Sequence, residues 1–135
     1  MRGKAGAGKT FRAKKLCEEK RAQLLSVDEL MEAMFGTECA GKEATLEREK
    51  RVLDYFLLLA LRNFNIGVST VIDHGFWRKD ELLRSADFLA KEKISCEICI
   101  IEADFKTRLE RVLQRNDGRV INEAKLRLFD GWYEN

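Results

Sequence analysis

The feature that most constrains the fold lies at the start of the chain, where residues 3–10 read Gly-Lys-Ala-Gly-Ala-Gly-Lys-Thr. They match GxxxxGK[ST], a loop in which backbone N–H groups surround phosphates, a lysine reaches the β- and γ-phosphates and a hydroxyl ligates Mg²⁺. Its glycines allow a tight turn and a close approach to an anion. A helix that begins near Lys9 would point the positive end of its dipole at the same phosphates. The pattern favours a phosphate-binding loop, and a flexible glycine-rich terminus is the alternative.

Length and composition limit the class of protein. A chain of 135 residues is long enough for a single domain, residues 1–135, with one core. Hydrophobic residues at 45% and charged residues at 36% are typical of a soluble globular protein. Because no apolar run could span a membrane and no signal peptide is apparent, we expect a cytoplasmic protein. The net charge of +2 is too small to favour a general nucleic-acid binder.

Two of the four cysteines, Cys96 and Cys99, have the CxxC spacing of some metal and redox sites. They fall in an apolar run, residues 96–101, that predicts a strand. Residues three apart on a strand point to opposite faces, so the two thiols would not bind one metal ion. With no second pair and no histidine nearby, we expect buried, reduced thiols at these positions and at Cys17 and Cys39.

Strand-like and helix-like segments alternate along the chain. Residues 68–73 are rich in β-branched side chains and lie between two glycines, which predicts a strand. Residues 24–27 and 96–101 are further strand-like runs. Helical spacing of apolar residues predicts helices over residues 9–22, 28–35, 42–63, 79–93, 104–115 and 122–132. This order implies a mostly parallel sheet with helices on both faces, a three-layer α/β/α fold in which ligands bind beyond the carboxyl ends of the strands.

Two aspartates follow predicted strands at that edge. Asp28 is placed to accept the proton of a hydroxyl that attacks a γ-phosphate, although an aspartate there is equally expected as a helix N-cap. Asp73 follows Val71 and Ile72 at the end of the clearest strand, where a carboxylate can orient Mg²⁺ or its water shell. Strands also end in aspartate because aspartate favours turns. The phosphate-loop motif favours the metal role for Asp73.

Arginines near the end of the chain are candidates to stabilise charge on a transferring phosphoryl group. Arg115 is the first candidate, since it lies near a helix end beside Asn-Asp-Gly, where the chain could fold over a nucleotide, and Arg119 is the second. For Arg108 and Arg111, a solvated helix face is the commoner explanation. His74 lies where an acceptor could bind, beside Phe-Trp, but we favour a structural histidine packed by local aromatic rings.

Four segments, GKAGAGKT, LLSVDEL, TVIDHGFWRKDE and EICIIEADFKTRLERVLQRN, resemble in order and spacing the small P-loop kinases of the AAA_33 or zeta-toxin-like group. Chloramphenicol phosphotransferase, zeta toxin and the kinase domain of polynucleotide kinase are of this kind. The resemblance covers nearly the whole chain. It implies a P-loop NTPase-like fold and a transfer of the ATP γ-phosphate, with Mg²⁺, to a hydroxyl of a small-molecule or nucleotide-type acceptor, with a nucleic-acid end not excluded.

The resemblance also implies roles for individual residues. Lys9 and Thr10 would hold the phosphates and Mg²⁺, and Asp73 would be the second residue at the metal. Asp28 matches the acid that activates the acceptor hydroxyl, and Arg115 matches the lid arginine. Motif and resemblance together give a nucleotide-binding set of Gly3, Gly6, Ala7, Gly8, Lys9, Thr10, Arg115 and Arg119.

One departure from the family concerns the strand that normally feeds the phosphate loop. In the family this strand lies between the strand that ends in the metal-site acid and the next one, whereas here only Met1 and Arg2 precede Gly3. We therefore expect this strand to be missing, with a loss of hydrogen-bond partners on both neighbours. The alternative to an active kinase is then a degenerate nucleotide-binding protein or a fragment of a kinase. The acceptor, the oligomeric state and the roles of His74 and Trp77 do not follow from the sequence.

Overall fold

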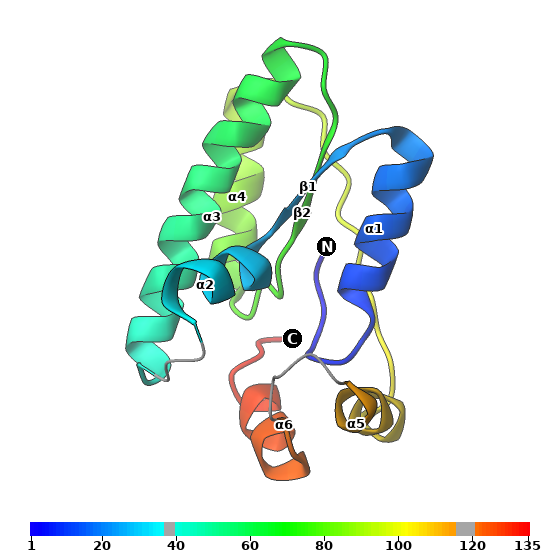
Figure 1. The fold of residues 1–135 in the computed structure, drawn as a ribbon. Helices are drawn as coiled ribbons and strands as arrows, with labels where there is room; N and C mark the ends of the chain where they lie inside the picture. The colour runs from blue at the N-terminus through cyan, green and yellow to red at the C-terminus, as the bar shows by residue number, and fades with distance from the viewer. Residues whose placement is uncertain (37–39, 116–120) are drawn as a thin grey trace.

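The computed structural model describes residues 1–36, 40–115 and 121–135. Helices and strands alternate through most of this described part (Figure 1). The elements are α1 (Lys9–Lys20), β1 (Gln23–Ser26), α2 (Val27–Phe35), α3 (Lys42–Asn65), β2 (Thr70–Asp73), α4 (Lys79–Lys91), α5 (Phe105–Gln114) and α6 (Glu123–Asp130). Each predicted helix is therefore present, with ends that shift by a few residues.

The sheet is parallel and small. β1 and β2 pair in register with Ser26 opposite Asp73, so both strands end at the same edge. α1 lies on one side of the two strands and α3 with α4 on the other, while α5 and α6 lie beyond the carboxyl ends (Figure 1). The packing of Leu25 and Val27 against Val52 and Phe56 joins β1 and α2 to α3 in a buried apolar cluster. The fold is therefore α/β, as predicted, but with fewer strands than expected.

The predicted strand over residues 96–101 is the clearest error of the sequence interpretation. In the described part of the chain this segment forms a single isolated bridge, in which Ile100 pairs in parallel with Arg2. A strand exists only where a neighbour completes its backbone hydrogen bonds, whatever its β propensity. Arg2 provides such a neighbour around Ile100, and the backbone of residues 96–98 has none in the described part of the chain.

Met1 and Arg2 occupy the position of the strand that we expected to be missing. The Met1 ammonium donates to the carbonyl of Ile72 in β2 at 2.7 Å. On the other side, the Arg2 N–H donates to the carbonyl of Cys99 and the Ile101 N–H donates to the carbonyl of Arg2, both at 2.8 Å. Bonds that alternate between two neighbours are typical of a strand inside a parallel sheet. Met1 and Arg2, referred to below as the stub, thus run as part of a central strand.

The described cysteines, Cys17, Cys96 and Cys99, are free thiols, and Cys39 lies outside the described residues. The prediction that they are buried is wrong for Cys96, which is exposed, and holds only in part for Cys17 and Cys99, which are partly buried. Among the described residues, no group of three or more metal-ligating His, Cys, Asp or Glu side chains occurs. A helix with the length and apolar character needed to cross a membrane is also absent from that part of the chain.

Candidate nucleotide-binding site

The phosphate loop joins the stub to α1 and is fitted closely against the rest of the domain. Gly6 has φ of +77°, and a Cβ there would lie 2.8 Å from the backbone oxygen of Arg108. A Cβ at Gly3 would likewise collide with the carbonyl oxygen of Ile101. Both positions require glycine because the segment just before α5 and the first turn of α5 pass against the loop. The loop is therefore part of the packed structure, which argues against the alternative of a flexible terminus.

Lys9 is the first residue of α1, and its ammonium lies under the loop, where it donates to the carbonyl of Lys4 at 3.1 Å. Burial lowers the pKa of Lys9, while the carboxylates of Asp28 and Asp73 raise it and the guanidinium of Arg115 lowers it further. A partly buried ammonium that donates to a neutral carbonyl is available to bind an anion. Three of its charged neighbours, Asp28, Asp73 and Arg115, are residues that the sequence selected for the site. The fourth, Arg108, is not one of them.

Thr10 and Asp73 meet directly. The Thr10 hydroxyl donates to the Asp73 carboxylate at 2.7 Å, which links α1 to the end of β2 across 63 positions of sequence. Asp73 is only 4% exposed, so its carboxylate is held within the site rather than in a solvated turn. A hydroxyl and a carboxylate oxygen are ligands that Mg²⁺ prefers, and the pair lies beside the phosphate loop. These two residues therefore fit a magnesium ion.

Asp28 lies in the first turn of α2, two residues after the end of β1. The alternative role of N-cap is wrong, since the cap is Ser26, whose side chain accepts from the Glu29 N–H at 3.4 Å. Asp28 is exposed, and its charge contributes to the pKa of Lys9. The register of β1 and β2 places Ser26 beside Asp73, so Asp28 comes from the strand end next to the metal-site acid. The backbone thus carries Asp28 to the site edge without using it for capping.

Two arginines of α5 hold the loop from outside. Buried Arg108 donates to both carboxylate oxygens of Asp130 in α6, at 2.8 and 2.6 Å, and to the carbonyl of Ala5 at 3.2 Å. Arg111 donates to the carbonyl of Ala7 at 2.9 Å. The expectation of a solvated helix face is therefore wrong for buried Arg108, whereas Arg111 is exposed as expected and still bonds to the loop. Nothing in the sequence indicated that Asp130 or the loop carbonyls would meet these arginines.

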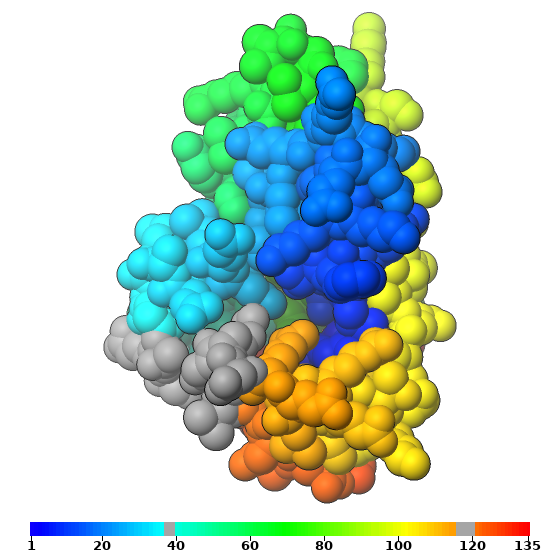
Figure 2. Space-filling model, turned by 45° about the vertical axis from the view of Figure 1, so that its right-hand side comes forward, coloured from blue at the N-terminus to red at the C-terminus, as the bar shows by residue number. Residues whose placement is uncertain are grey.

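Arg115 caps the carboxyl end of α5 in an extended conformation and is exposed. The charge of its guanidinium contributes to lowering the pKa of Lys9. Figure 2 shows the face on which α2, the first turn of α1 and α5 surround a hollow. Arg119, the second lid candidate, lies outside the described residues.

A comparison with protein-family models shows to which family the chain belongs. The model of an AAA domain, AAA_33, matches residues 1–135. The chain belongs to this family. A search of curated proteins gives no match. Membership of the family makes the chain a P-loop NTPase-like α/β domain of the nucleotide-binding type, in agreement with the loop, Lys9 and the Thr10–Asp73 pair.

In this AAA domain His74 is a structural residue, as favoured from the sequence. It is buried, its ring packs edge-on against Phe76 at 4.7 Å, and its Nδ1 accepts from the Phe76 N–H at 3.2 Å. Trp77 packs against Phe129 of α6 and against Trp132, with ring centroids 5.8 and 6.3 Å away. Both side chains therefore attach the segment after β2 to its surroundings.

The C-terminal tail of the AAA domain supports the stub, which the sequence did not reveal. Arg2 donates to the carbonyls of Phe76 and Glu134, and its guanidinium lies 4.8 Å from the ring centroid of Tyr133. The Glu134 N–H in turn donates to the carbonyl of Trp77 at 2.6 Å. No local pattern announces contacts between residues more than 130 positions apart. The C-terminal tail therefore holds Arg2, which directly precedes the phosphate loop.

Proposed function

We propose that this AAA domain is an ATP-dependent phosphotransferase of the zeta-toxin-like kind, which moves the γ-phosphate to a hydroxyl of a small-molecule or nucleotide-type acceptor. The observation that carries the proposal is the hydrogen bond between Thr10 and Asp73 beside Lys9. Charged side chains from α2, from β2 and from α5 with its C-cap all shift the pKa of Lys9. Such convergence supports a site for a highly charged anion.

Lys9 and the loop N–H groups would bind the phosphate oxygens, with Thr10 and Asp73 holding Mg²⁺, which supplies charge neutralisation when bound. The acceptor oxygen attacks the γ-phosphorus, and the bond from that phosphorus to the bridging oxygen breaks with its electron pair leaving on ADP. Asp28 takes the proton of the acceptor hydroxyl. Exposure of Asp28 is consistent with this role, because the acceptor must reach it from solvent.

Arg115 has a separate role in the proposal. Charge on the equatorial oxygens of the transferring group grows in the transition state, and a guanidinium aimed at them lowers the barrier. Arg108 is not available for this purpose because Asp130 and Ala5 already bind its guanidinium. The described part of α5 thus offers Arg115 for catalysis and uses Arg108 for structure.

A second candidate function is nucleotide binding without transfer. It is favoured by one observation, that the residue just before the loop, Arg2, pairs with the segment before α5 only through an isolated bridge to Ile100 in the described structure. If the stub does not hold the loop still during the reaction, binding could persist while transfer is lost. The two functions differ in what Asp28 contributes.

The deciding experiment combines calorimetric titration of ATP and Mg²⁺ with an assay of phosphate transfer to a panel of hydroxyl compounds. Lys9→Ala should weaken nucleotide binding by about 10- to 100-fold, the size of a lost hydrogen bond to a charged group. Lys14→Ala, at an exposed position of the same helix, is the matched control and should change nothing.

Asp28→Asn separates the two functions. The phosphotransferase requires that it keep nucleotide affinity and lose transfer by about 10²- to 10⁴-fold, as expected for removal of a general base. Transfer at the wild-type rate would remove Asp28 from the mechanism. Binding of ATP with no transfer by the wild-type chain to any acceptor tested would favour the second function.

A further inference from the structure

Three buried polar side chains gather between α3, α4 and the end of β2. They are Glu49 of α3, His74 after β2 and Glu81 in the first turn of α4, each at most 9% exposed. Nε2 of His74 lies 3.8 Å from Oε2 of Glu49. Burial raises the pKa of Glu81, and the charges of His74 and Arg78 lower it. The charge of Glu49 also raises this pKa, so the three side chains interact across three elements of the fold.

The hydrogen bonding of these three side chains is incomplete. Four buried side-chain atoms in the described structure have no hydrogen-bond partner, and three of them are Oε2 of Glu49, Nε2 of His74 and Oε2 of Glu81. Such atoms are rare in folded proteins, because burial deprives them of hydrogen bonds to bulk water. The 3.8 Å between Glu49 and His74 is too long for a direct hydrogen bond and suits a molecule that bridges the two. Three such atoms in one place therefore indicate a shared partner.

The hydrogen bonds of His74 define the chemistry of that partner. Its Nδ1 accepts from the Phe76 N–H at 3.2 Å, so this nitrogen carries no proton and Nε2 carries the ring proton. The partner must therefore accept a hydrogen bond from Nε2–H and donate hydrogen bonds to the carboxylates of Glu49 and Glu81. A water molecule has this combination of one accepted and two donated bonds, and buried waters typically make about three.

Two kinds of cation do not meet these requirements. Because Nε2 carries a proton, it offers no lone pair to a metal ion, and the search for metal-ligating groups among the described residues does not select this cluster. An ammonium ion has no lone pair with which to accept from Nε2–H. Solvent, in contrast, lies close by, because Glu81 also lines a surface groove of about 460 Å³ between the starts of α3 and α4.

We propose that Glu49, His74 and Glu81 together bind one buried water molecule, which joins α3 and α4 to the end of β2. The water accepts a hydrogen bond from Nε2–H of His74 and donates one hydrogen bond to each carboxylate. It gives all three side chains the partner that the protein itself does not supply.

The water has a consequence for the neighbouring Asp73. With Nδ1 bound to the Phe76 N–H and Nε2 bound to the water, both nitrogens of the His74 ring are fixed. Because His74 directly follows Asp73, the backbone that carries the Asp73 carboxylate is fixed with it. This step rests on the proposed function, in which Asp73 holds Mg²⁺. Glu49 and Glu81 are then positioning residues, which act on the magnesium site through His74.

Nuclear magnetic resonance tests the water site without any nucleotide. His74 is the only histidine in the sequence, so protein labelled with ¹⁵N-histidine gives the spectrum of this one ring. We expect the ring proton on Nε2 and a dipolar contact of that proton with water, which a rotating-frame experiment separates from proton exchange. A proton on Nδ1, or an Nε2 proton without dipolar contact with water, would overturn the proposal.

Substitutions at Glu81 test its part in the site. Glu81→Gln retains an oxygen that accepts a hydrogen bond, and it should keep the contact between water and the His74 ring. Glu81→Met has a similar length but offers no such oxygen, and the contact should be lost. Glu47→Met, at an exposed position of α3, is the matched control and should leave the spectrum unchanged. If the Glu81→Met protein keeps the contact, Glu81 does not bind the water and the proposal fails.

The effect on Asp73 is measured by calorimetric titration of ATP with and without Mg²⁺. Glu81→Met should raise the Mg²⁺ concentration needed for half-maximal strengthening of ATP binding about three- to tenfold. This is less than the roughly 10- to 100-fold change typical of groups that bond directly to a metal ligand. ATP affinity without Mg²⁺ should not change, and Glu81→Gln should restore the wild-type Mg²⁺ requirement.

The outcomes separate the inference from the proposed function. Equal weakening of ATP binding with and without Mg²⁺ would show that Glu81 has a general structural role, and it would overturn the link to Asp73. If the wild-type chain binds no ATP at all, the proposed function fails, whereas the spectrum of His74 still decides whether the water is bound.

Discussion

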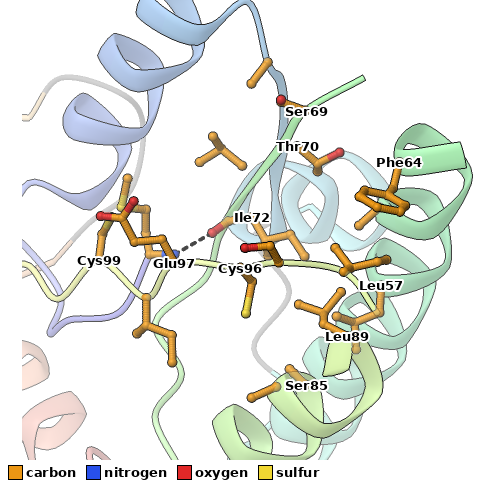
Figure 3. Close-up of a pocket in the computed structure, with 18 of the residues that line it drawn as sticks. Leu57, Phe64, Ser69, Thr70, Ile72, Ser85, Leu89, Cys96, Glu97 and Cys99 are labelled. Carbon is orange, nitrogen blue, oxygen red and sulfur yellow. Dashed lines mark hydrogen bonds between the residues drawn. The ribbon is translucent and has the colours of Figure 1, made fainter. Parts of the chain in front are cut away.

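The two ends of the sheet are held together in different ways. At the carboxyl end, Thr10, Arg108 and Arg2 bind partners that are distant in sequence, so the loop, α5, α6 and the tail interlock. At the amino end, residues 68–72 and 95–99 line an open cavity of about 610 Å³ (Figure 3). The contrast shows that contacts between distant parts of the chain position the phosphate loop, whereas the other end of the sheet is less closely packed.

The largest effect should come from breaking the interlocked end at Arg108. Arg108→Ala removes a buried guanidinium from Asp130 and the loop, and we expect a loss of about 3 kcal/mol of unfolding free energy because the partly buried Asp130 carboxylate and the Ala5 carbonyl lose their partner. Arg84→Ala is the control, since the Arg84–Asp54 pair is solvent-exposed and should be worth less than about 1 kcal/mol. Urea unfolding measures both. Equal losses would mean that burial does not distinguish the two ion pairs.

A smaller effect should come from adding one methyl group at each end of the sheet. Gly6 and Gly67 share φ of +77°, but a Cβ at Gly6 would press on the Arg108 backbone while a Cβ at Gly67 would meet open space. Both alanine variants should lose about 1 kcal/mol from the backbone conformation, and Gly6→Ala should lose about 1 to 3 kcal/mol more from crowding. Thermal unfolding of the two variants tests this difference. A loss of stability at Gly67 as large as at Gly6 would show that the amino end of the sheet is also closely packed.

The smallest effect concerns the Met1 ammonium at the boundary between the two ends. Its pKa is lowered from 8.0 by burial, so in the pH range just below 8.0 the unfolded chain holds more protons than the folded one. Folding stability should therefore rise with pH through that range and level off above it. Acetylation of the amino group should remove this part of the slope. Urea unfolding midpoints measured against pH provide the test. If the midpoints of the acetylated and unmodified chains change in parallel with pH, the ammonium is not buried.

The sequence predicted those features that depend on local patterns. Helical spacing and glycine positions identified α1 to α6 and the phosphate loop, and the ends of apolar runs identified Asp28 and Asp73. It failed where a partner far along the chain decides the outcome. The segment 96–101 has strand composition but is not a strand, because among the described residues only Arg2 forms a backbone bridge with it. Arg108 has a surface-like sequence context, yet Asp130 and Ala5 bury it.

The most direct test compares the nucleotide affinity of this chain with that of the chain extended by Val-Ile-Val-Ile-Val ahead of Met1. Calorimetry with ATP and Mg²⁺ gives both dissociation constants under the same conditions. If side-chain contacts at the carboxyl end already hold the loop, the two constants should agree within about threefold, a difference below 1 kcal/mol. Binding by the extended chain alone would contradict this, because the phosphate loop would then depend on the strand beneath it.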